Sequence, residues 1–88
     1  MPRIEFTSKD EIKKWVSARM DPAKYECYLT ASKEVILVPM VSTRPIMYVY
    51  FQSYSGDDLQ EVRDLITSRG VHVYVVSNFE WRDDDRIR

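Results

Sequence analysis

The sequence predicts a single α/β (α+β) domain in which two helices pack on a mixed, mainly antiparallel sheet. Two segments carry apolar residues at helical spacing, whereas other segments alternate with a period of two and are rich in β-branched and aromatic residues. Their order along the chain is β-α-β-β-β-α-β. A chain of 88 residues has room for one core, so we expect residues 1–88 to form one domain.

The first predicted elements are a short strand and a helix. Residues 3–6 alternate charged and apolar side chains, which is typical of a strand. Ser8 and Glu11 then have the spacing of a capping box. The apolar residues that follow on one helical face are Ile12, Trp15, Val16 and Met20. Asp21 and Pro22 end this helix, because proline disfavours the helical conformation of the residue before it.

Residues 25–54 change to the period of strands, with interruptions at 31–34 and 42–45. We therefore expect three strands joined by two four-residue connections. Ser55 to Asp58 form a second capping box, followed by the apolar stripe Leu59, Val62, Leu65 and Ile66. This helix is predicted to end at Arg69 and Gly70. Residues 71–76 form the last predicted strand, and the polar residues from about 80 to 88 are expected to fray.

The two four-residue connections predict which strand residues share a face. They place Thr30 opposite Val35 and Val41 opposite Ile46. One face, expected to lie under the helices, then holds Tyr25, Cys27, Leu29, Ile36, Val38, Met40, Met47, Val49 and Phe51. The other face holds Glu26, Tyr28, Thr30, Val35, Leu37, Pro39, Val41, Ile46, Tyr48, Tyr50 and Gln52. This second face is too apolar for a solvated antiparallel sheet, so we expect something to cover it.

The apolar second face favours a small non-enzymatic binding module that works by protein association. We expect a homodimer, or a complex with another protein, that buries this face. The predicted binding residues are Tyr28, Leu37, Tyr48, Tyr50, Tyr54 and Tyr74. Leu37 and the strand tyrosines would then lie side by side at the interface.

A nucleic-acid-binding domain that uses the same face is the alternative. Aromatic side chains on an open sheet can stack on bases, and Lys33 and Arg44 would supply phosphate contacts. A net charge of −1 disfavours this alternative, because it provides no overall attraction for a polyanion.

No residue pattern indicates catalysis, a metal or a cofactor. His72 is the only histidine, and Cys27 falls on the predicted core face without a basic neighbour. The order of elements after the first strand resembles that of restriction-endonuclease-like nucleases. Residues 46–54, the candidate metal-binding strand in that comparison, contain neither a carboxylate nor a lysine. A nuclease-like domain of this kind would be catalytically degenerate, so we expect no enzymatic activity.

The sequence also predicts a cytoplasmic protein without a membrane span. Cys27 is the only cysteine and has no partner for an intrachain disulfide. The first residues do not form a basic and then apolar leader, and the longest apolar stretches are too short to cross a bilayer as helices.

Overall fold

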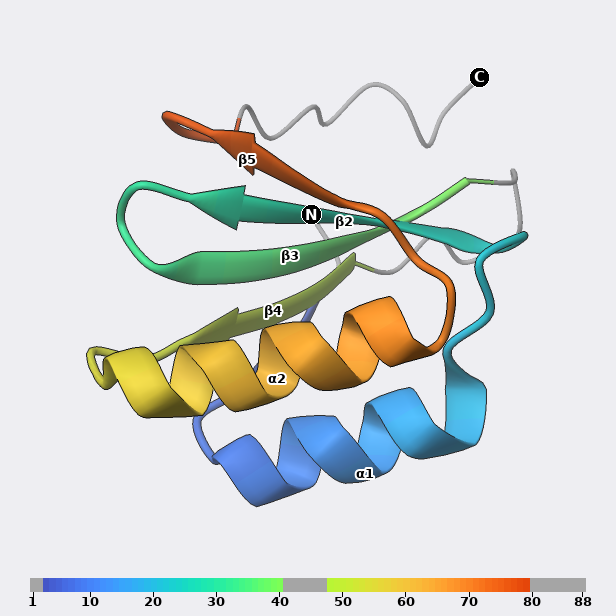
Figure 1. Ribbon diagram of the computed structural model, residues 1–88, viewed down its shortest axis with the longest axis horizontal. Coiled ribbons are helices and arrows are strands. Elements are labelled where there is room, and N and C mark those ends of the chain that lie inside the picture. The colour runs from blue at the N-terminus through green and yellow to red at the C-terminus, as the bar shows by residue number, and fades with distance from the viewer. Residues whose placement is uncertain (1–2, 41–47, 80–88) are drawn as a thin grey trace.

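The computed structural model, described for residues 3–40 and 48–79, has two layers, a five-stranded sheet and a pair of helices on one of its faces (Figure 1). The order of elements is the predicted β-α-β-β-β-α-β. The elements are β1 (Arg3–Phe6), α1 (Lys9–Arg19), β2 (Tyr25–Thr30), β3 (Glu34–Pro39), β4 (Tyr48–Gln52), α2 (Gly56–Ser68) and β5 (Val73–Val76). The predicted tail at 80–88 and the predicted β3–β4 connection at 42–45 lie outside the described residues.

The strands lie in the order β1-β4-β3-β2-β5, so β1 and β5 form the two edges of the sheet. The three central strands are antiparallel neighbours, whereas β1 pairs parallel to β4 and β5 pairs parallel to β2. The sheet is therefore mixed, as the sequence predicts. Neither helix among the described residues is long and apolar enough to span a membrane.

Local sequence signals account for the helix ends. The Ser55 hydroxyl accepts a hydrogen bond from the Asp58 N–H at 3.3 Å, which caps α2 as predicted. Ser8 precedes α1, but its side chain forms no capping hydrogen bond, so only the position of this helix start was predicted correctly. Gly70 follows α2 with a φ of 83°, a left-handed conformation that glycine adopts without strain.

The core lies between the helices and the adjacent face of the sheet. Ile12 and Val16 of α1 and Val62 and Ile66 of α2 are fully buried. They belong to one cluster with the sheet residues Cys27, Val35, Leu37, Val49, Phe51 and Val73. Outside this core, the helices are also joined at the surface, where Glu61 bridges Lys9 and Lys13 at 3.2 and 2.8 Å.

The predicted register of β3 is wrong by one residue. The structure pairs Val35 with Leu29 and with Phe51, which places Val35 and Leu37 on the helix side of the sheet. Ile36 therefore lies on the other face, with the tyrosines. The side chains of β2 and β4 keep their predicted faces, because only β3 has moved relative to its two neighbours. A shift of one residue reverses every side chain of a strand.

Candidate functional site

The candidate site is the sheet face that the helices leave uncovered, which we call the open face. Tyr28 pairs with Tyr74 across β2 and β5, and Tyr50 lies two residues from Tyr48 on β4. Side chains two residues apart on a strand share a face, and register partners do as well. The structure thus brings four of the six predicted binding residues to the open face.

Two predicted binding residues lie elsewhere. Leu37 is fully buried on the helix side, so its predicted place on the binding face is wrong, for the reason of register given above. Tyr54 is 81% exposed in the connection between β4 and α2, outside the sheet. Of the predicted phosphate contacts, Lys33 lies in the turn between β2 and β3, and Arg44 lies outside the described residues.

The middle of the open face is covered by the chain itself. After β5 the chain returns across the sheet, and the Phe79 ring lies 5.4 Å from the Tyr28 ring and 6.3 Å from the Tyr48 ring. Tyr48 is only 5% exposed, and Ile36, which pairs with Tyr28, is fully buried. Part of the cover that the sequence led us to expect is therefore intramolecular.

One end of the open face carries a hydrogen-bonded network that holds Tyr50 in place. The Tyr50 hydroxyl donates to Glu34 Oε2 at 2.8 Å, and the Thr30 hydroxyl donates to the other carboxylate oxygen at 2.9 Å. The Arg3 guanidinium lies 4.9 Å above the Tyr50 ring. Burial and the bond to Glu34 raise the pKa of Tyr50 to about 12. Tyr50 is thus engaged within the fold.

The other end, at β2 and β5, is an aromatic cluster open to solvent. The rings of Tyr28 and Tyr74 stack at 5.4 Å, and the His72 ring meets Tyr74 edge-on at 4.5 Å. Burial raises the pKa of Tyr28, and the nearby Glu26 carboxylate adds to this shift. Tyr74 is 43% exposed, and its neighbour Val75 is 67% exposed on the opposite side of the strand. This cluster is the part of the predicted face that a partner can reach.

The charge of the open face is mainly negative among the described residues. Strand alternation places Glu26 and Glu34 on the same side as the tyrosines, together with the Arg3 and Glu5 pair of β1, which are joined at 2.8 Å. Three carboxylates and one guanidinium make a poor surface for phosphate groups.

Catalytic geometry is not assembled among the described residues. No group of three His, Cys, Asp or Glu side chains that could hold a metal occurs in residues 3–40 and 48–79. Cys27 is buried in the core, which raises the pKa of its thiol to about 12 and keeps it protonated at neutral pH. His72 contacts an aromatic ring, which cannot orient it as a carboxylate does.

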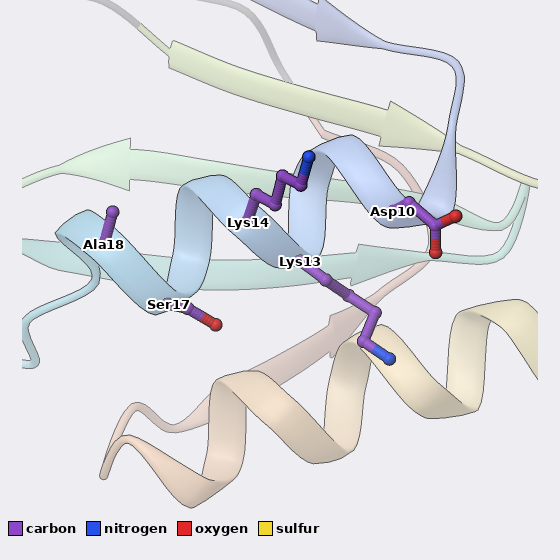
Figure 2. Close-up of a pocket in the computed structure, with 5 residues that line it drawn as sticks. All are labelled: Asp10, Lys13, Lys14, Ser17 and Ala18. Carbon is purple, nitrogen blue, oxygen red and sulfur yellow. The ribbon is translucent and has the colours of Figure 1, made fainter.

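The surface has a hollow along α1 and another beside β5. A shallow one of about 580 Å³ lies along α1 and is lined by Asp10, Lys13, Lys14, Ser17 and Ala18. Figure 2 shows that its polar side chains point in different directions, and Lys13 extends toward α2, where it bonds Glu61. A smaller hollow of about 200 Å³ lies beside His72 and Tyr74 at the start of β5. Only the second adjoins the aromatic cluster.

No family model matches the chain, and comparisons with curated proteins and with solved structures found no match. Function must therefore be inferred from the geometry of the site.

Several residues that shape the site were not predicted from the sequence. Phe79 was assigned to no predicted element, although an aromatic residue among polar neighbours could have signalled packing. Ile36 was assigned to the helix side through the wrong register. The exposure of Val75 follows from the place of β5 at the edge of the sheet, which no local pattern reveals.

Proposed function

We propose that this protein is a small non-enzymatic binding module of the cytoplasm that works by protein association, as a homodimer. The observation that carries the proposal is the edge of the sheet at β2 and β5, where Tyr74 is exposed beside the Tyr28 ring and Val75 is exposed on the opposite side of the same strand. Tyrosine supplies a large contact area with little loss of conformational entropy, and it is common at the centre of interfaces. The lone buried thiol of Cys27 is compatible with a reducing compartment.

The proposed contact surface is smaller than the one predicted from the sequence. Tyr48 and Tyr50 already contact Phe79 and Glu34 within the chain, so they support the sheet instead of meeting a partner. Binding of nucleic acid is disfavoured, because stacked bases at Tyr74 would bring phosphates near the carboxylates of the open face.

Association is tested by sedimentation velocity of the wild type from micromolar to millimolar concentration. We expect a reversible dimer that Tyr74→Lys weakens at least about tenfold, because the charge would be buried at the contact. Tyr54→Lys is the matched control, since it makes the same change at an exposed tyrosine outside the sheet. A monomeric wild type at millimolar concentration, or equal effects of the two variants, would overturn the proposal. A salt-dependent shift with a single-stranded oligonucleotide would instead favour nucleic acid.

A further inference from the structure

The two edges of the sheet differ in how they are protected. Edge strands present unpaired backbone groups, and natural proteins usually blunt them with charged residues, proline or bulges. β1 carries the charged residues Arg3 and Glu5. β5 has the sequence Val-Tyr-Val-Val, without a charge or a proline, and no described strand pairs with its outer side. The exposed side chains of Tyr74 and Val75 lie on this unblunted edge.

The register shows which backbone groups of β5 point outward. The Met40 N–H donates to the Lys24 carbonyl at 2.8 Å, so the even-numbered residues of β2 direct their backbone groups toward β3. The odd-numbered residues of β2 then face β5. In a parallel pair, one residue of each register pair directs its backbone N–H and C=O toward the neighbouring strand. Its partner directs its own N–H and C=O away from that strand. The pairing of Cys27 with Val73 therefore turns the N–H and C=O of Val73 and Val75 toward the outer edge.

We propose that β5 pairs antiparallel with β5 of a second copy, with Tyr74 opposite Tyr74. This inference rests on the proposed function and names its geometry. Val73 of each chain then exchanges backbone hydrogen bonds with Val75 of the other, and the two tyrosines form the closer, non-hydrogen-bonded pair. The two-fold axis is perpendicular to the sheet, so both helix layers lie on the same side of one continuous sheet.

The chemistry of the edge favours a second copy as the occupant. In a two-fold dimer, β5 of one copy pairs with β5 of the other, so like charges on this strand would face each other and repel. The described edge contains only valines and a tyrosine, and the pairing sets Val75 against Val73, apolar against apolar. It also covers the two exposed side chains together. A four-residue strand buries much less than the ~1,200 Å² of a stable interface, so the dimer should form in the micromolar to millimolar range.

The test is hydrogen exchange of individual amides, followed by NMR on the full chain at low and high concentration. We expect the amides of Val73 and Val75 to become protected as concentration rises, whereas the amides of Tyr74 and Val76, which face β2, stay protected throughout. Rapid exchange at Val73 and Val75 in a sample that sedimentation shows to be dimeric would overturn edge pairing while leaving the homodimer in place. A monomer at all concentrations would overturn both.

A pair of variants tests the same hydrogen bond independently. Val75→Pro removes the outward N–H, a change that edge strands tolerate, and should abolish the dimer with the circular dichroism spectrum preserved. Val75→Thr keeps both the N–H and the β-branched shape, and should leave association within about twofold. Association through the open face alone would instead survive Val75→Pro and be lost in Tyr74→Lys.

Discussion

Replacement of Leu37 by alanine tests the register of β3, which determines which β3 side chains lie on the open face. Leu37 is fully buried between the sheet and the helices. The change removes three buried carbon atoms at about 0.8 kcal/mol each and leaves a cavity that adds to this cost. We expect the free energy of unfolding to fall by about 3 kcal/mol in urea titrations, and Tm to fall by on the order of 15 °C.

Val38→Ala is the matched control, because Val38 is the next residue and lies half-buried on the open face. It should cost about 1 kcal/mol, since a smaller side chain is removed from a less buried place. The register predicted from the sequence alone would reverse this order, with Val38 under the helices and Leu37 outside. A larger loss for Val38→Ala than for Leu37→Ala would refute the observed register.

Three further predictions concern single groups. Because the pKa of Tyr50 is raised from 10.0 to about 12, its contribution to stability should be complete below pH 10 and lost as the pH rises through 12. In urea titrations between these pH values, the free energy of unfolding should fall less steeply with pH for Tyr50→Phe than for the wild type. Burial raises the pKa of the Cys27 thiol to about 12, so a thiol reagent should label Cys27 only at the rate at which the native protein unfolds locally. Rapid labelling of Cys27 in native buffer would contradict this. Lys33 has a φ of 65°, and Lys33→Gly should raise the free energy of unfolding by up to about 1 kcal/mol in thermal melts, whereas Lys33→Ala should bring no such gain.

The order of elements could be predicted because the signals that determine it are local. The change from helical to alternating spacing marks where α1 ends and β2 begins, and Asp21 and Pro22 stand at that boundary. Asp21 Oδ1 accepts a hydrogen bond from the Ala23 N–H at 2.9 Å, which fixes the turn after the helix. Ser55 likewise caps α2 through atoms only three residues away in sequence. Interactions over such short separations leave a readable pattern.

The register of β3 was mispredicted because it depends on the conformation of one turn residue. The turn between β2 and β3 contains three residues, not four, and its last residue is Lys33 in the left-handed region. Glycine or asparagine usually marks such a position, so lysine there gives no warning in the sequence. Thr30 stabilises the short turn, since its carbonyl accepts from Lys33 N–H at 3.0 Å and its hydroxyl accepts from Glu34 N–H at 3.1 Å.

The candidate site was only partly predictable because residues far apart in sequence determine which tyrosines remain accessible. Alternation along β2 and β4 correctly placed Tyr28, Tyr48 and Tyr50 on one face. It could not show that Phe79 would lie against two of these rings. Nor could it show that Glu34 would bond Tyr50, because residues 31–34 were predicted to form a connection, whereas β3 begins at Glu34.

A short strand such as β5 has its backbone groups paired on both sides at the centre of a sheet, but on one side only at an edge. The proposed interaction depends on this difference. An uncharged, valine-rich strand is ordinary where both neighbours are strands, since its backbone groups are paired and its side chains are buried. From the sequence, residues 71–76 therefore predict a strand and nothing more. The order β1-β4-β3-β2-β5 places that strand at an edge, next to solvent, and leaves Val75 exposed there. Since β1 at the opposite edge carries Arg3 and Glu5, protection is not missing from the sheet as a whole. Of the two edge strands described, only β5 lacks a charged residue or a proline. A strand that pairs with β5 of a second copy needs such an uncharged edge.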